Sequence, residues 1–337
     1  FLTCFPYSPD NIVGMLYGIE SSGGLLYVWR AAVNRVRMQV KCRDEIQRNI
    51  TTEEISVAIL DTGIGRHPDF GDRILSFVDF VNGRWSSYDD SGHGTHVAGC
   101  VGGNGHASHG SYKGIAPACR LCIGKVLDQN GEGCVESMHR GLEWVLKNHI
   151  RYQIRVLNVS LGIGSSGEME HMEELVELLD AAWEEGIVVV CAAGNNGPEE
   201  GTISPLGCSR RVITVGCHEG GYFGARRDLC ENYSGRGSRS ILYRKPDVVA
   251  PGTDILSCNV RWKGNDRIGY RNAYTRKSGT SMATPVVSGA AALLLQKYPY
   301  MNNDQVKRKM IYSAYDMGDS WNKQGWGMLD VEKMCME

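Results

Sequence analysis

Short runs of apolar, often β-branched residues recur along the chain from residue 55 onward. A run that is apolar throughout, without alternation, is typical of a strand buried on both faces of a parallel sheet. Flanking glycines supply the tight turns that such strands need at their ends. We therefore predict strands over Ile55–Leu60, Arg120–Leu127, Val156–Leu161, Ile187–Ala193 and Val212–Cys217.

Helical periodicity fills the segments between these runs. Apolar side chains three or four residues apart predict amphipathic helices over Val135–His149, Glu168–Glu185 and Asn303–Tyr315. Ala283–Lys297 is apolar on nearly all sides, which predicts a buried helix. Alternating strands and helices predict an α/β fold with a mostly parallel central sheet and helices on both faces. In such sheets the functional residues gather at the carboxyl ends of the strands.

The first 50 residues follow neither pattern. Residues 1–24 are aperiodic and rich in Pro, Gly and Ser, whereas Leu25–Arg48 predicts a basic helix with an apolar face. We expect residues 1–50 to be an N-terminal extension packed on one domain of residues 51–337. The extension either lies in a binding cleft as an inhibitory segment or packs on the back of the domain and stabilises it. We favour the second interpretation. The apolar face of the predicted helix comprises Leu26, Trp29, Val33, Val36 and Val40.

Composition narrows the class of protein. Hydrophobic residues make up 42% and charged residues 22%, and a net charge of −2 with interspersed signs argues against nucleic-acid binding. No apolar run approaches the roughly 18 residues of a membrane span. The twelve cysteines lack the spacing of a disulfide framework, and Cys119–Cys122 lacks a second pair for zinc. Buried free thiols, which we expect here, favour a reducing compartment.

Three polar residues stand at the ends of predicted strands or at the start of the apolar helix, and a fourth, His93, lies between two glycines before small residues that suit a helix packed on the sheet. Acyl transfer by serine needs a nucleophile, a base, an orienting carboxylate and donors for the oxyanion. Ser281, His93, Asp61 and Asn195 offer these groups in turn. Each alone has an ordinary interpretation, namely a helix cap, a core histidine, a turn aspartate and an Asn-Gly turn.

Three segments around these residues resemble the catalytic signatures of the subtilisin-like serine peptidases, the subtilase family (peptidase family S8). They are Asp-Thr-Gly at 61–63, His-Gly-Thr-His-Val-Ala-Gly at 93–99 and Gly-Thr-Ser-Met-Ala-Thr-Pro at 279–285. Ala-Ala-Gly-Asn at 192–195 resembles the family's oxyanion segment. Similar stretches also occur at 112–117, 245–252 and 325–327, so that the resemblance covers about residues 52–331.

The resemblance implies a subtilisin-like three-layer fold and a serine endopeptidase with an Asp61–His93–Ser281 triad and Asn195 in the oxyanion hole. An extended peptide or protein substrate would lie between two strand segments, Ser160-Leu161-Gly162 beside the S1 pocket and Gly131-Glu132-Gly133 opposite it. Two alternatives stay open: a peptide ligase or macrocyclase, and a catalytically silent binding scaffold. His96 is interpreted as structural, because no Glu stands between it and His93 in metalloprotease spacing.

The sequence departs from the family in its loop at residues 103–111. Relatives carry a calcium loop there, and Asp69 matches one of their calcium ligands, whereas His106 and His109 are poor ligands for a cation that prefers oxygen. Asp69 is therefore the one calcium candidate, and no cofactor is required by the chemistry. Asp89, Asp90 and Glu132 fall in segments that flank the cleft in relatives. Their charges predict a preference for basic residues at P2 or P4, unless they are ordinary solvated acids.

Overall fold

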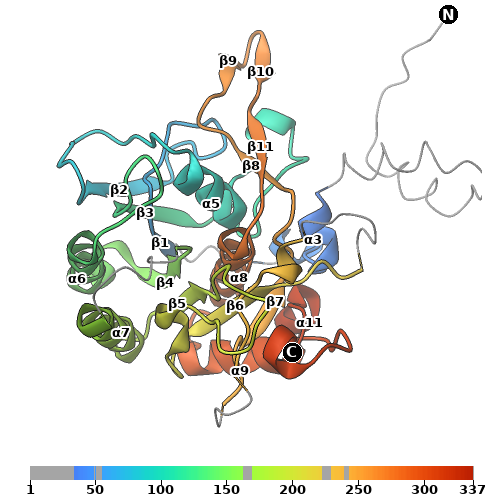
Figure 1. The fold of residues 1–337 in the computed structure, drawn as a ribbon. Helices are drawn as coiled ribbons and strands as arrows, with labels where there is room; N and C mark the ends of the chain where they lie inside the picture. The colour runs from blue at the N-terminus through green and yellow to red at the C-terminus, as the bar shows by residue number, and fades with distance from the viewer. Residues whose placement is uncertain are drawn as a thin grey trace, which may run out of the picture.

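A seven-stranded sheet forms the centre of the computed structural model, which describes residues 34–48, 50, 55–161, 169–221, 229–238 and 243–336 (Figure 1). Its strand order is β2-β3-β1-β4-β5-β6-β7, and every neighbouring pair is parallel. The strands are β1 (Ser56–Asp61), β2 (Ile74–Asp79), β3 (Arg120–Lys125), β4 (Ile154–Val159), β5 (Val188–Ala192), β6 (Ile213–Cys217) and β7 (Val248–Ala250).

Helices cover both faces of this sheet, which confirms the three-layer α/β fold. Helices α5 (His93–Gly102) and α8 (Thr280–Lys297) pack against each other on one face, and α6 (Val135–Tyr152) and α7 (Met169–Glu184) pack together on the other (Figure 1). The remaining helices of the described region after β1 are α9 (Asn303–Ser313), α10 (Trp321–Gln324) and α11 (Val331–Cys335), with the 3₁₀ turns η1 (His106–Ser108), η2 (Pro205–Cys208) and η3 (Cys230–Asn232).

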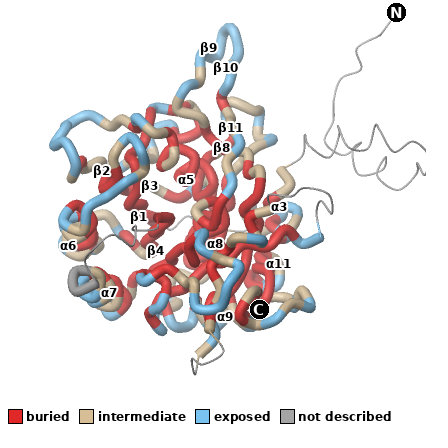
Figure 2. Tube along the Cα trace, viewed as in Figure 1, coloured by how far each residue is buried: buried red, intermediate tan, exposed pale blue. Residues whose placement is uncertain are grey.

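Helix α8 is the central element of the core. All of its residues are buried except Ser281 and Lys297, as its uniformly apolar sequence predicts (Figure 2). It contacts β4, β5 and β6, and its first turn lies at the carboxyl edge of the sheet, where Thr280 N donates to Asn195 Oδ1 shortly after the end of β5. The helix thus holds Ser281 at the edge where function was expected.

A long hairpin stands apart from the main sheet. Strands β8 (Ile255–Cys258) and β11 (Tyr274–Lys277) pair antiparallel, and β9 (Lys263–Asn265) and β10 (Gly269–Arg271) continue the hairpin outward. Its tip projects from the body of the molecule and is largely exposed (Figures 1 and 2). The sequence analysis predicted neither this hairpin nor the edge strands β2 and β7.

The continuous helix predicted over Leu25–Arg48 is wrong in the part that the structure describes. Residues 34–48 form two short helices, α3 (Arg35–Gln39) and α4 (Asp44–Arg48), because the backbone breaks at Lys41 with φ of 53°. The break buries Val40 fully and lets its carbonyl accept a hydrogen bond from Val331 N at 2.8 Å. Tertiary contacts thus outweigh helical periodicity here. Residues 1–33 lie outside the described residues.

The cysteines that the structure describes are all free thiols. Nine of them are buried, including Cys119 and Cys122, while Cys134 and Cys208 are exposed. Burial raises the pKa of Cys119 to about 11 and that of Cys122 to about 12, so both stay protonated and serve packing. Among the described helices none is both long and apolar enough to span a membrane.

Candidate active site

Asp61 and His93 meet at the carboxyl edge of the sheet. Asp61 is the last residue of β1 and is fully buried, and His93 is the first residue of α5. His93 Nδ1 lies 2.7 Å from Asp61 Oδ1. The approach depends on Gly94, because a Cβ there would lie 2.2 Å from the Gly63 carbonyl oxygen. Glycine at this position thus lets the start of α5 rest against the end of β1.

The contact with Asp61 determines the chemical state of His93. A carboxylate accepts hydrogen bonds, so His93 Nδ1 carries the proton and Nε2 is the basic nitrogen. Burial of the ring opposes its positive charge, but the attraction and hydrogen bond of Asp61 outweigh it and raise the pKa of His93. His96, by contrast, is fully buried and bonds Ile255 O at 2.8 Å, and burial lowers its pKa to about 3. These contacts match the structural role predicted for His96.

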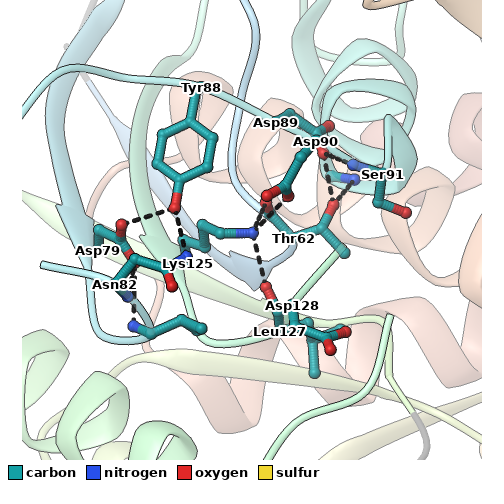
Figure 3. Close-up of polar contacts among 12 residues, drawn as sticks. Thr62, Asp79, Asn82, Tyr88, Asp89, Asp90, Ser91, Lys125, Leu127 and Asp128 are labelled. Atoms are coloured by element: carbon teal, nitrogen blue, oxygen red, sulfur yellow. Dashed lines mark hydrogen bonds and ion pairs between the residues drawn. The ribbon is translucent and has the colours of Figure 1, made fainter. Parts of the chain in front are cut away.

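Asp89 organises the backbone around both residues. It is buried, and its carboxylate accepts hydrogen bonds from Gly92 N at 2.7 Å and from both Thr95 N and Thr95 Oγ1 at 2.8 and 2.6 Å. Its other two donors are Ser91 N at 3.2 Å and Thr62 Oγ1 at 2.8 Å (Figure 3). Thr62 Oγ1 in turn accepts a hydrogen bond from Gly94 N. One carboxylate therefore joins the residue after Asp61 to the first turn of the helix that begins at His93.

Ser281 stands in the first turn of α8. Gly279, which precedes the helix, has φ of 147°, and its N–H is bonded to Gly252 O at 2.9 Å. The unpaired N–H groups of a helix start favour developing negative charge nearby. No hydrogen bond to the Ser281 hydroxyl forms among the described residues, and such bonds are often long in a free active site. The position suits a nucleophile that becomes aligned when substrate binds.

Asn195 follows β5 and faces the same helix start. Its Oδ1 accepts hydrogen bonds from Thr280 N and Thr280 Oγ1, both at 3.0 Å. A backbone N–H can only donate, so the amide must turn its oxygen to Thr280 and leave Nδ2 as a donor. Nδ2 makes no hydrogen bond within the described parts of the chain. Asn195 is solvent-exposed, so this donor is open to a ligand.

The two predicted substrate segments follow β4 and β3. Ser160 and Leu161 are buried directly after β4, whereas Gly162 lies outside the described residues. In the other segment, Glu132 donates its N–H to Asp128 Oδ1 at 2.9 Å and accepts from Asp128 N at 2.8 Å. Gly131 has φ of 81°, so residues 128–132 form a closed turn. Of this segment, only Gly133 keeps its backbone N–H and C=O free of hydrogen bonds to the described residues.

The side chain of Lys125 connects the residues that follow β1 and β3 to Asp90. Its side chain is fully buried, and its Nζ donates to Thr62 O, Leu127 O and Asp90 Oδ1 at 2.9, 2.8 and 2.8 Å (Figure 3). The sequence analysis missed this residue, although a lone lysine in the apolar run of β3 was a visible signal. It also missed the roles of Thr62 and Thr95, which lie inside the quoted signatures.

These contacts change the prediction that Asp89, Asp90 and Glu132 together create a negative electrostatic field at the cleft. Asp89 is buried and fully bonded, and Asp90 is neutralised by Lys125, so neither is a free acid facing the cleft. Asp90 and Glu132 are both exposed, but of the two only Glu132 forms no ion pair with the described residues. The predicted preference for basic P2 or P4 residues therefore depends on Glu132 alone.

Asp69, the calcium candidate, lies in a group that suits calcium poorly. His67, Asp69 and Cys258 are buried with ligand atoms within 4.8 Å of one another, the only such group in the described ranges. Nitrogen and sulfur are poor calcium ligands, and protein donors already bind both Asp69 oxygens: Ala107 N at 2.9 Å and Tyr274 OH at 2.8 Å. Of the two loop histidines, His106 pairs with Asp266 and His109 is exposed. These residues do not fit calcium.

Comparison with known proteins gives consistent matches. The profile described as "Subtilase family" matches residues 52–327. Serine protease AprX of Bacillus subtilis (strain 168) is 39% identical over 278 residues, which cover 78% of this chain and 62% of that protein. Subtilisin DY of Bacillus licheniformis is 35% identical, covering 82% of this chain and 89% of that protein. Subtilisin Savinase of Lederbergia lenta is 34% identical, covering 85% and 92%. The chain thus spans less than two thirds of AprX but most of each subtilisin.

Proposed function

Because this chain belongs to the subtilase family, we infer that it is a serine endopeptidase whose nucleophile is Ser281. His93 would accept the Ser281 proton through Nε2 as Oγ attacks the peptide carbonyl. Asp61 would hold the ring in the required tautomer and stabilise the imidazolium. The observation that carries the proposal is the 2.7 Å contact between His93 Nδ1 and the buried Asp61.

The oxyanion would be stabilised by Asn195 Nδ2 together with N–H groups of the α8 start. Thr280 holds the Asn195 oxygen, so the amide donor is oriented before substrate arrives. A preorganised donor of this kind stabilises the charge that develops in the transition state and needs no rearrangement during the reaction. The tetrahedral intermediate would then collapse as His93 returns the proton to the leaving amine, which leaves an acyl-enzyme on Ser281. Water would attack that ester with His93 as base.

The substrate would be a peptide or protein bound as an extended chain. Ser160 and Leu161 on one side, and Gly133 on the other, would offer it backbone groups. No observation favours a peptide ligase or a silent scaffold. Mass analysis of the products tests the ligase, because ligation joins fragments whereas hydrolysis adds one water.

Labelling with a fluorophosphonate tests the nucleophile directly. We expect a single adduct on the tryptic peptide that contains Ser281, and none on Ser281→Ala. Thr280→Ser, one residue earlier, is the matched control and should keep the label. Labelling at another serine, or no labelling of a folded protein that also cleaves no peptide, would disprove the proposed function.

A further inference from the structure

The hairpin β8–β11 carries a concentration of positive charge that the proposed mechanism does not use. Residues 255–277 contain six basic residues and one acid, which gives +5 in a chain of net charge −2. The acid, Asp266, is already bound by His106 Nε2 at 2.8 Å and Tyr270 OH at 2.7 Å. The six basic residues are Arg261, Lys263, Arg267, Arg271, Arg276 and Lys277.

Most of these charges have no partner among the residues that the structure describes. Arg276 donates to Asp254 O at 2.9 Å. The side chains of the other five form no ion pair or hydrogen bond with any residue that the structure describes. Four of them are exposed, and Lys277 is half-buried. A ligand would therefore meet unneutralised cations along the hairpin.

The hairpin is held in place by contacts at two levels. Near the tip, Trp262 donates its indole N–H to Arg66 O at 2.6 Å, and Asp266 ties the β9–β10 turn to η1 through His106. Midway along the hairpin, between β8 and β9, Val260 packs on the glycine backbone next to His93: a Cβ on Gly92 would lie 3.0 Å from Val260 Cγ1. The charges are thus fixed relative to the active site.

The reaction itself determines which half of the substrate passes this hairpin. His93 must give its proton to the leaving amine, so the peptide on the carboxyl side of the scissile bond departs past His93. The middle of the hairpin is packed beside His93, and Lys277 at its base lies four residues before Ser281. The segments proposed for the amino-terminal half follow β3 and β4 instead. The leaving half therefore faces the basic hairpin.

We propose that the hairpin is a binding site for acidic side chains on the leaving-group side of the substrate, and that the enzyme prefers Asp and Glu there. The inference rests on the proposed peptidase function. Six residue steps separate Arg271 from Lys277, which is at most about 20 Å, because the chain leaves the extended conformation at Asn272 between β10 and β11. An extended peptide covers that distance in about six residues. The preference should therefore reach from P1′–P2′ near Lys277 to about P6′ near Arg271.

Three quenched fluorescent peptides test the proposal on the intact enzyme. They share one amino-terminal half and carry Glu, Ala or Lys at P2′, P4′ and P6′. Single exposed charge pairs change binding only a few-fold, so we expect kcat/KM for the Glu peptide to exceed that for the Lys peptide by roughly tenfold at low salt. At 0.5 M salt screening should remove most of this ratio. A ratio near one at low salt, with all three peptides cleaved, would overturn the inference and leave the peptidase function standing.

Charge reversal assigns the preference to the hairpin. The triple variant Lys263→Glu, Arg267→Glu and Arg271→Glu changes exposed residues only, so its melting temperature should match that of the wild type. It should lower the Glu-to-Lys peptide ratio at least threefold while cleavage of the Ala peptide stays unchanged. The matched control reverses three exposed charges on α6 and α9, namely Lys147, Arg151 and Arg308. An equal fall of the ratio in both variants would mean that net charge, and not the hairpin, sets the preference.

Discussion

Arg35 Nη1 lies 2.9 Å from Glu219 Oε2, and the two side chains are only 12% and 1% exposed. The other Glu219 oxygen accepts from Gly252 N at 3.1 Å and Thr253 N at 2.7 Å. Gly252 O then accepts from Gly279 N, two residues before Ser281. A residue of the N-terminal segment is thus connected, through one buried carboxylate, to the backbone that precedes the nucleophile.

Arg35→Ala should therefore destabilise the protein strongly. It leaves the Glu219 carboxylate buried without its cation, a change that typically costs about 3–5 kcal/mol. Urea unfolding should show a lower midpoint with an unchanged slope. The double variant Arg35→Ala with Glu219→Gln should recover part of the loss, since the uncompensated charge is gone. Equal stability of Arg35→Ala and the wild type would contradict the pairing.

Deletion of residues 1–24 separates the two interpretations of the extension, most of which lies outside the described residues. If those residues stabilise the domain, the truncated protein melts earlier and cleaves a small peptide no faster. Faster cleavage at an unchanged melting temperature would instead support the inhibitory interpretation. This deletion retains Arg35, so a change in melting temperature would not come from loss of the Arg35–Glu219 ion pair.

Ser281→Ala and Asn195→Ala should both lower kcat, but to different extents. The first should lower kcat by about 10⁴ or more at an unchanged melting temperature, since the hydroxyl makes no hydrogen bond within the described region. The second should lower kcat by about 10²–10³ with little change in KM, the magnitude known for subtilisin. Thr280→Val is the control: it removes one of two bonds to Asn195 Oδ1 and should cost far less. A change of KM alone in Asn195→Ala would mean that the amide binds substrate.

The pH dependence of kcat/KM should change when Lys277 is replaced by an uncharged residue. His93 acts as a base only when its ring is neutral, so kcat/KM rises with pH through the pKa of His93. Burial and, more weakly, the positive charge of Lys277 lower that pKa, whereas the attraction and hydrogen bond of Asp61 raise it. Lys277→Met should therefore raise the pKa and move the acid limb to higher pH. Arg271→Met, farther along the hairpin, should leave the limb in place. An unchanged limb in Lys277→Met would show that its charge does not reach the ring.

Lys125→Met should lower both the stability of the protein and its kcat/KM. The change leaves the carbonyls of Thr62 and Leu127 without their buried donor and Asp90 without its cation. An unsatisfied buried polar group costs about 1–3 kcal/mol, so we expect a loss of several kcal/mol in urea unfolding together with a lower kcat/KM. Asp90→Asn alone should cost less, because it leaves both carbonyl bonds intact. A Lys125→Met protein of wild-type stability would contradict this account.

Chelation tests the prediction about calcium. The oxygens of Asp69 are occupied by Ala107 N and Tyr274 OH, so calcium has no free carboxylate there. We expect the same melting temperature in EDTA and in millimolar calcium, since a ligand that does not bind the native state cannot stabilise it. A clear rise of the melting temperature with calcium would contradict this prediction. It would mean that calcium binds at another site or displaces the hydrogen bonds to Asp69.

The sequence predicted what depends on local pattern. Strands buried on both faces and the apolar helix α8 were found because every residue points into the core. Strand β2 is half-buried at the sheet edge and β7 has three residues, so neither gives a long apolar run. In the hairpin, β8 and β11 have four residues each and β9 and β10 are largely exposed, so none of them gives a long apolar run.

The residues of the candidate site also differ in whether the sequence alone predicts them. The residues proposed for catalysis lie in recognisable segments, whereas Asp89 and Lys125 act through backbone groups that only folding brings near. The sequence predicted Asp89 as a charge beside the cleft or an ordinary solvated acid, because its five donors come together only when the turn before α5 packs against Thr62. A carboxylate that binds backbone N–H groups has no sequence signature of its own. The same holds for a lysine that binds carbonyl oxygens.

The burial of α8 has a consequence for how the protein loses activity. Amides of a helix enclosed on all sides exchange with solvent only when the whole domain opens, whereas an exposed hairpin tip opens locally. Ser281 therefore lies on the part of the chain whose amides should exchange slowest. The proposed acid-binding surface lies on a part whose amides should be among the fastest to exchange. Gentle heating or brief proteolysis should therefore erase discrimination among leaving-group sequences first, while cleavage of a short neutral peptide persists until the core unfolds.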